Sequence, residues 1–298
     1  MPETENLSSS NTKIILVTGG AGFVGSHLIE TLLQENTSYQ IYSLDNYFTG
    51  KTHNHIQGAT YIEGDTKDID TLITVVPHIV FHLGEYSRVE SSFDDVKTVF
   101  DFNKIGTFSV LEFCRKHKCK LVYAGSSTKF ADGGMGRDQS PYAWTKAANT
   151  ELVINYGSWY GLPYAITYFY NVYGNREITE GKYATLIGIF KEKIKKKEPL
   201  TIVSPGTQER NFTHIKDIVR GLVLVGERGE GDGYGLGSEE VFTVKEVADL
   251  FGGDIVMLPE RKGNRMQAYI DVSRAKNEFG WKAEHILRDH IRDFLKKI

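Results

Sequence analysis

The sequence has little cysteine and no long apolar run. Cys114 and Cys119 are the only cysteines in 298 residues, and they form neither a CxxC pair nor a metal-ligand spacing, which excludes a disulfide framework and favours reduced thiols. No stretch approaches the ~18 apolar residues of a membrane-spanning helix. The polar, acidic N-terminus lacks the basic start and apolar core of a secretion signal. We therefore expect a cytoplasmic protein without a metal ion or a membrane span, in which residues 1–12 form a flexible tail.

The sequence also has no large excess of positive or negative charge. The 35 Lys and Arg residues nearly balance the 38 Asp and Glu residues, for a net charge of −3, so the chain has no overall attraction for nucleic acid. The basic run from Lys191 to Lys197 is interpreted as the solvated face and end of a helix. With 40% apolar residues, the chain is an ordinary globular one, long enough for one large domain or two coupled ones.

Strand and helix patterns alternate through the first 174 residues. Short apolar runs predict strands, and four-residue apolar spacing, as at Val24, Leu28 and Leu32, predicts helices. Such alternation forms a parallel sheet covered on both faces, with ligands bound at the carboxyl ends of the strands. The predicted strands are 13–18, 40–44, 60–65, 79–83, 121–124 and 164–169, and the predicted helices are 22–35, 94–117 and 142–160.

Gly19, Gly22 and Gly25 follow the first strand and open the first helix, with GxxGxxG spacing. Glycine lets a backbone approach a pyrophosphate closely, and the amides at the start of the helix attract phosphate. We therefore expect a dinucleotide here, and the alternative is a plain glycine turn. Asp45 ends the second strand, where a carboxylate binds ribose hydroxyls and repels a 2′-phosphate, which favours NAD over NADP. Asp65 ends the third strand, and we expect it on the adenine side; for both aspartates the alternative is a turn residue.

The second half of the chain is less regular. It predicts a helix over 182–197, a strand over 200–203, glycine-rich turns over 226–238, a helix over 243–251 and a strand over 254–258. We expect an α/β protein with a Rossmann-type doubly wound parallel sheet. Its NAD-binding domain, residues 13–174, carries the catalytic residues. Residues 175–298 form mainly a smaller substrate-binding lobe, with some segments that return to the large domain.

Tyr142 and Lys146 lie four residues apart on a predicted helix. Positions i and i+4 share one helix face, so both side chains can meet a single substrate. A free phenol, with a pKa of about 10, is a poor base at neutral pH, and a nearby cation favours its ionised form. The pair is therefore a candidate for proton transfer, and the alternative is a surface tyrosine with an unrelated lysine.

Five motifs together resemble the extended short-chain dehydrogenase/reductase superfamily, in its NAD-dependent nucleotide-sugar epimerase/dehydratase branch. The motifs are Val17 to Ser26, Asp45-Asn46 with Thr49-Gly50, Phe81 to Gly84, Ser140 to Lys146, and Asn171 to Gly174, and the likeness extends over nearly the whole chain. The resemblance implies that Tyr142 is the catalytic base, that Lys146 favours its phenolate and holds the nicotinamide ribose, and that Ser126 hydrogen-bonds the reacting oxygen.

The resemblance also implies two sets of binding residues. Those expected to bind NAD are Gly19, Gly22, Phe23, Val24, Asp45, Asn46, Thr49, Gly50, Asp65, Thr66, Leu83, Gly84, Ser87, Asn103, Tyr142 and Lys146, with Asn103 packing the active-site loops. Those expected to bind an NDP-sugar are Ser127, Thr128, Asn171, Arg210, Arg261, Asp271 and Arg88. Two arginines suit a diphosphate because each guanidinium binds oxygen pairs bidentately; surface arginines are the alternative.

The resemblance leaves a choice of reaction. Dehydratases of the branch carry an acid pair directly after the active-site Ser or Thr, and its 3,5-epimerising reductases carry a cysteine near position 128. This chain has Ser127 and Thr128, which do not titrate near pH 7. We therefore expect an NDP-sugar epimerase that acts at C4 and keeps its NAD bound. The alternatives are an NDP-keto-sugar reductase or dehydrogenase, a 4,6-dehydratase-like enzyme, and a dinucleotide-binding protein without catalysis.

The chain departs from the family pattern around the expected sugar site. Glu85 stands where a small residue is usual, followed by Tyr86 and Arg88. Arg88 is a candidate for recognising an acidic sugar such as a uronate, and the alternative is a salt bridge to Glu85 or Glu90. The family resemblance further implies a homodimer, formed by a four-helix bundle of the 94–117 helix and the helix after Tyr142. Its candidate contacts are Val99, Phe102, Phe108 and Leu111, for which burial inside the monomer is the alternative.

Overall fold

A seven-stranded parallel sheet forms the centre of the molecule. The computed structural model describes residues 12–130, 132–260, 266–267 and 269–298. The sheet has the order β11-β6-β5-β4-β1-β2-β3, in which every neighbouring pair is parallel. Its strands are β1 (Ile14–Thr18), β2 (Gln40–Asp45), β3 (Ala59–Glu63), β4 (Ile79–His82), β5 (Lys120–Ser126), β6 (Tyr164–Phe169) and β11 (Gly231–Leu236). The expected Rossmann-type α/β fold is confirmed.

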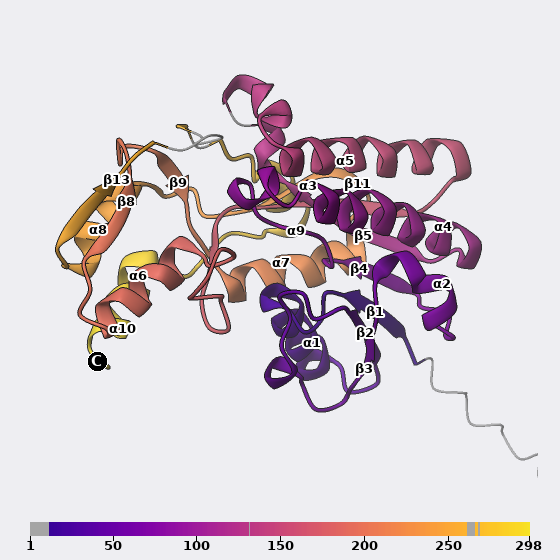
Figure 1. Cartoon of the computed structure of the whole chain (residues 1–298). Coiled ribbons are helices and arrows are strands. Elements are labelled where there is room, and N and C mark those ends of the chain that lie inside the picture. The colour runs from indigo at the N-terminus through magenta and orange to yellow at the C-terminus, as the bar shows by residue number, and fades with distance from the viewer. Residues whose placement is uncertain (1–11, 131, 261–265, 268) are drawn as a thin grey trace, which may run out of the picture.

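Helices cover both faces of this sheet (Figure 1). On one face lie α1 (Phe23–Glu35), α7 (Ile215–Arg228) and α9 (Ser273–Phe279); on the other lie α2 (Ile69–Leu72), α3 (Val96–Val99), α4 (Thr107–His117) and α5 (Pro141–Tyr160). Successive strand residues point to opposite faces, so Ile15 and Val17 join the core under α1 and α7, whereas Leu16 joins the core under α4 and α5. The strands are therefore apolar on both faces, as a doubly covered sheet requires.

The prediction of turns over 226–238 is wrong, because residues 231–236 form the edge strand β11 beside β6. Glycine is a poor strand former, which is why this segment has the pattern of turns. Here the glycine serves packing: a Cβ at Gly235 would lie 1.8 Å from the carbonyl oxygen of Asp271. The edge strand needs glycine because another segment of backbone crosses it closely.

Two predicted helices also differ in their extent. The predicted 94–117 helix is divided by a π-helical turn, Phe100–Gly106, between α3 and α4. The predicted 182–197 helix begins only with α6 (Leu186–Lys195), where the side chain of Thr185 accepts a hydrogen bond from the amide of Gly188. Residues 182–185 are therefore loop, which matters for the cavity described below.

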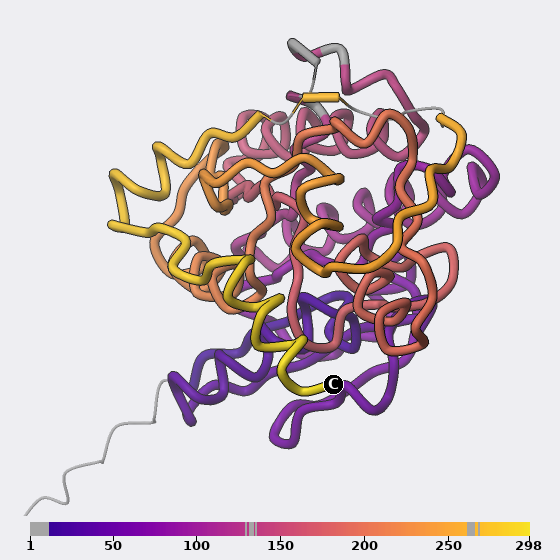
Figure 2. The backbone as a smooth tube through the Cα atoms, turned by 90° about the vertical axis from the view of Figure 1, so that its left-hand side faces the viewer, coloured from indigo at the N-terminus to yellow at the C-terminus, as the bar shows by residue number. Residues whose placement is uncertain are grey.

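A smaller lobe lies to one side of the sheet, and Figure 2 views the molecule from that side. Its helices, α6, α8 (Val244–Phe251) and α10 (Leu287–Leu295), pack around a separate core that includes Phe190, Leu200 and Phe251. Three strand pairs complete it and join it to the large sheet: β8 (Leu200–Val203) with β13 (Ile255–Leu258), β9 (Glu209–Asn211) with β12 (Val241–Thr243), and β7 (Val172–Tyr173) with β10 (Thr213–His214). None of the helices in the described part of the chain is long and apolar enough to cross a bilayer.

Candidate active site

A cavity of about 640 Å³ lies between the carboxyl ends of the sheet strands and the smaller lobe. Its volume is in the range of cofactor and small-molecule sites. Of the expected residues it is lined by Gly19, Gly22, Phe23, Val24, Asp45, Asn46, Thr49, Gly50, Thr66, Leu83, Gly84, Ser87, Arg88, Ser126, Ser127, Thr128, Tyr142, Lys146, Asn171 and Arg210. Asp65, Asn103 and Asp271 are not among the described lining residues, and Arg261 lies outside the residues that the structure describes.

The glycine turn brings three segments of backbone into contact at one end of the cavity. Gly19 has a φ of +72°, and a Cβ there would lie 2.9 Å from the backbone of Gly84. A Cβ at Gly25 would lie 2.1 Å from the carbonyl oxygen of Gly19. Helix α1 starts directly after Gly22, which has no side chain to cap it, so the first amides of the helix are presented at the cavity wall.

The carboxylate of Asp45 is hydrogen-bonded to the backbone of this turn. One carboxylate oxygen accepts the amide of Ala21 at 2.9 Å, and the other accepts the amide of Tyr47 at 2.8 Å. Burial raises the pKa of Asp45, and these two backbone hydrogen bonds oppose that effect. Asp65 instead accepts a hydrogen bond from the side chain of Asn46 at 2.6 Å. Asp65 thus contacts the cavity wall through Asn46.

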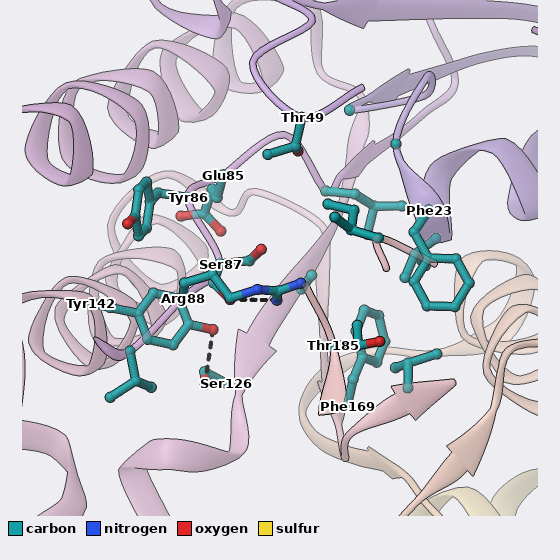
Figure 3. A pocket seen from close by; sticks show the side chains of 18 of the residues that line it. Phe23, Thr49, Glu85, Tyr86, Ser87, Arg88, Ser126, Tyr142, Phe169 and Thr185 are labelled. Atoms are coloured by element: carbon teal, nitrogen blue, oxygen red, sulfur yellow. Dashed lines mark hydrogen bonds between the residues drawn. The ribbon is translucent and has the colours of Figure 1, made fainter. Parts of the chain in front are cut away.

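The side chains of Tyr142, the predicted base, and Ser126 are in contact at the cavity wall. Tyr142 donates its hydroxyl hydrogen bond to Ser126 Oγ at 3.2 Å, and Ser126 Oγ lies 2.9 Å from Thr128 Oγ1 (Figure 3). Ser126 ends β5, and Tyr142 stands in the first turn of α5, where Ser140 caps the helix and Pro141 starts it. A strand end and a helix start therefore fix the two hydroxyl groups at the same point.

Lys146 lies one helical turn below Tyr142, and it is buried. Its ammonium group forms an ion pair with Glu85, donates a hydrogen bond to the carbonyl oxygen of Ala124, and lies 4.4 Å from the centre of the Tyr123 ring. The sequence analysis singled out Glu85 as a departure and missed this contact. The only signal for it was a charged residue placed three positions after the end of the buried strand β4.

Asn103 lies in the π-helical turn and is fully buried behind the cavity wall. Its side chain accepts the amide of Tyr86 at 2.7 Å and donates to the carbonyl oxygen of Tyr86 at 3.2 Å and to Thr145 Oγ1 at 3.1 Å. It thereby fixes the loop after β4 against α5. This position suits the packing role implied for it.

Comparison with known proteins agrees with this geometry. A family model described as the NAD dependent epimerase/dehydratase family matches residues 15–237. The chain belongs to this family. It is 31% identical over 299 residues to the putative UDP-glucose 4-epimerase of Methanocaldococcus jannaschii, covering 94% of this chain and 96% of that protein. It is 28% identical to UDP-glucuronic acid decarboxylase 6 of Arabidopsis thaliana, covering 93% of this chain and 86% of that protein.

Solved structures give the same result. The UDP-glucose 4-epimerase of Thermus thermophilus, in complex with NAD, superposes with a TM-score of 0.85 at 27% identity, covering 95% of this chain and 98% of that one. The UDP-glucose 4-epimerase of Thermotoga maritima, with UDP-glucose, superposes with a TM-score of 0.87 at 26% identity, covering 95% and 99%. The expected family is thus confirmed, and so is NAD as its cofactor.

The residues present fit NAD. The missing side chains at Gly19 and Gly25 let backbone approach backbone at the start of α1, where a pyrophosphate is favoured. Each oxygen of Asp45 accepts one described hydrogen bond and so retains a lone pair for a ribose hydroxyl. The same carboxylate would repel a 2′-phosphate.

Arg88 crosses the cavity beside the pair formed by Tyr142 and Ser126 (Figure 3). Its guanidinium donates hydrogen bonds to the carbonyl oxygens of Tyr183, at 2.7 Å from Nε, and of Ser87, at 3.0 Å from Nη1. Burial lowers the pKa of Arg88. Glu85 pairs with Lys146, so the alternative of an Arg88–Glu85 salt bridge is not what the structure shows.

The remaining predicted substrate residues divide between the cavity and its surroundings. Asn171, at a φ of +35°, lines the cavity and donates to the carbonyl oxygen of Asn211 at 2.8 Å, while Arg210 lines it from β9. Asp271 accepts hydrogen bonds from the amide and hydroxyl of Ser273, at 3.0 and 2.6 Å, at the start of α9. Asp271 therefore holds a turn in the described structure.

Much of the wall on the side of the smaller lobe was not predicted. It comes from the loop before α6, from α6 itself and from the short strands around it. These residues are Ile178, Ala184, Thr185, Leu186, Ile187, Ile189, Thr201, Val203, Gln208, Phe212, Val244 and Leu258. Most are apolar and belong to no motif, so no local pattern distinguished them from core residues.

Proposed function

We propose that this protein is an NAD-dependent nucleotide-sugar epimerase that inverts C4 of its sugar through a transient 4-keto sugar. The observation that carries this proposal is the hydrogen bond between Tyr142 and Ser126, at the cavity wall and one turn above a buried lysine. In its phenolate form, Tyr142 takes the proton of the sugar hydroxyl while Ser126 hydrogen-bonds the same oxygen. Bound NAD supplies the acceptor for the hydride that leaves this carbon.

The residues next to Ser126 support epimerisation over dehydration. Elimination of water across two carbons needs a second acid and base, and the neighbouring cavity residues are Ser127 and Thr128. The hydroxyl of Thr128 already contacts Ser126, at 2.9 Å. Inversion needs no further group, because the keto sugar has only to present its other face before the hydride returns to that carbon and Tyr142 returns the proton to its oxygen. A reductase would in addition need soluble NADH or NADPH.

The rest of the substrate is assigned to the wall nearest the smaller lobe. Asn171, directly before β7, and Arg210, on β9, line it, and an amide and a guanidinium suit a diphosphate. Arg88 lies nearer Tyr142, beside the sugar position, so we keep it as the candidate for binding an acidic sugar. The family relatives that act on UDP-glucose and on UDP-glucuronic acid make both neutral and acidic sugars reasonable test substrates.

The test is a panel of NDP-sugars, neutral and uronate, incubated with the purified protein without added cofactor and followed by proton NMR. We expect one substrate to reach an equilibrium with its C4 epimer, and NAD to be released when the protein is denatured. A 4-keto-6-deoxy product would replace this proposal with dehydration. Turnover that requires added NADH or NADPH would replace it with reduction.

We also propose that two copies pair through α4 and α5. Phe108 on α4 is 50% exposed, and Trp159 and Tyr160 on α5 are 59% and 56% exposed, in a helix pair that covers one face of the sheet (Figure 1). The candidate contacts need correction: Val99 and Leu111 are fully buried in the monomer, and Phe102 lines the cavity. The exposed aromatic residues supply the apolar area instead.

Changing Phe108 to glutamate is expected to convert the dimer to a monomer, because a charge would be placed in an apolar interface. Light scattering coupled to gel filtration would measure the mass. Val241→Glu is a matched control, since Val241 is similarly exposed, at 49%, but lies on β12 of the smaller lobe. A monomeric parent protein, or equal dissociation in both variants, would refute this pairing.

A further inference from the structure

We propose that Glu85 is a positioning residue that acts as the counter-ion of Lys146 and so sets the net charge beneath the catalytic tyrosine. This rests on the proposed function only in that Tyr142 is taken as the base. The side chains of Glu85 and Lys146 are 4% and 5% exposed, and they form an ion pair at the cavity wall. Lys146 lies one helical turn from Tyr142 on α5, and this connects the ion pair to the proton transfer.

The surrounding side chains hold Glu85 in one orientation. Besides Lys146, its carboxylate accepts hydrogen bonds from Thr107 Oγ1 at 2.9 Å, from Asn149 Nδ2 at 3.0 Å and from Tyr123 OH at 3.2 Å. These donors come from α4, α5 and β5, so three elements converge on one carboxylate. The carboxylate of Glu85 thus has four donors. Because a buried carboxylate without such partners is strongly unfavourable, these donors stabilise it in this position.

The π-helical turn contributes to this arrangement. Asn149 Nδ2 lies 2.6 Å from the carbonyl oxygen of Asn103, which belongs to that turn, and 3.1 Å from Thr107 Oγ1. A π-helical turn shifts the backbone hydrogen bonds by one residue. The amide of Asn149 therefore bridges the π-helical turn to Glu85, and the irregular helix and the buried carboxylate form one unit.

Among the other titratable groups around Glu85, His82 and Tyr123 do not supply its charge balance. Burial lowers the pKa of His82 to about 4, and burial and Glu85 both raise the pKa of Tyr123, so each is neutral at pH 7. Lys104 donates to Asn149 at 2.9 Å and has its pKa lowered by burial. The titratable groups around Glu85 are thus His82 from β4, Lys104 from the π-helical turn, Tyr123 from β5 and Lys146 from α5.

This pairing has two consequences for Lys146. Two of the three ammonium hydrogens are directed at Glu85 and at Ala124, which leaves the third for a hydroxyl in the cavity. The carboxylate also balances the charge of a lysine whose side chain is only 5% exposed. At the same time it offsets the positive field that Tyr142 would experience from an unpaired ammonium.

The first test is the pH profile of kcat/KM for Glu85→Gln, which keeps the shape of the side chain and removes its charge. Losing the negative charge weakens the hold on the Lys146 proton and also favours the anionic form of the base. Both limbs of the profile are therefore expected to move to lower pH by about one unit. Glu90→Gln, which removes an exposed carboxylate five residues further along the chain, should leave both limbs in place. A uniform loss of rate without displacement would overturn the proposal.

A second measurement needs no activity, so it separates failure of this proposal from failure of the proposed function. Removing one member of a buried ion pair leaves the other unpaired, so Glu85→Gln and Lys146→Met are each expected to lower Tm by about 10 °C. The double variant leaves neither charge unpaired and should recover at least half of one single loss. Additive losses would show that the two groups are not coupled and would overturn the pairing.

Discussion

Replacing Tyr142 with phenylalanine is expected to lower kcat by about 10²- to 10⁴-fold, the range usual for loss of a positioned general base. The substitution removes a single oxygen, whose described hydrogen bond goes to Ser126 at 3.2 Å. The ring itself remains in the first turn of α5, so binding of the nucleotide-sugar and the unfolding temperature should change little. Steady-state kinetics on the substrate identified by the NMR panel would measure the effect.

A tyrosine on the same helix provides the control. Tyr160 ends α5 and is 56% exposed, so Tyr160→Phe should retain the parent kcat. If Tyr142→Phe interconverted the nucleotide-sugar as fast as the parent protein, then the proton would be taken by another group. The role assigned to the hydrogen bond between Tyr142 and Ser126 would then be wrong.

The parts of the site that depend on local spacing could be predicted from the sequence. The glycine turn works because three glycines, a strand and a helix start fall within twelve residues, and each of these signals is visible in the chain itself. Tyr142 and Lys146 share a helix face by their spacing alone. Asp45 was expected at the cavity because a parallel sheet collects the carboxyl ends of its strands at one edge, and Ser126 was expected there from the family resemblance; both line it.

The parts that depend on distant packing could not be predicted. Glu85 meets Lys146 across 61 positions of sequence, and its acceptor role appears only when α4, α5 and β5 converge on it. The strand β11 has the composition of a turn, and its Gly235 is required by the backbone of Asp271, which lies far away in the sequence. Val99, Leu111 and Phe108 are all apolar, and only the folded structure shows that the first two are buried whereas Phe108 is exposed.

Replacing Gly25 with alanine is expected to weaken the binding of NAD by about 10- to 100-fold and to lower the unfolding temperature. The added Cβ would lie 2.1 Å from the carbonyl oxygen of Gly19 and 2.8 Å from the Cα of Gly20. These are backbone atoms, and Gly19 is itself held by a 2.8 Å hydrogen bond from its amide to Leu44. The turn must therefore move to remove this clash, and such overpacking costs about 1–3 kcal/mol. Each ~1.4 kcal/mol of this cost that weakens NAD binding lowers the affinity tenfold.

Gly22→Ala is the matched comparison. A Cβ at Gly22 would lie 3.1 Å from the same carbonyl oxygen, a tight contact that a small shift of the turn relieves. Thermal unfolding without added cofactor, and calorimetric titration with NAD, should both rank Gly25→Ala as the more damaged variant. The ranking follows from the position of α1: Gly25 in its first turn packs closely against the backbone of Gly19, and Gly19 packs closely against Gly84, two residues after β4. If Gly25→Ala bound NAD as tightly as the parent protein, then this contact between α1 and the turn would not shape the cofactor site.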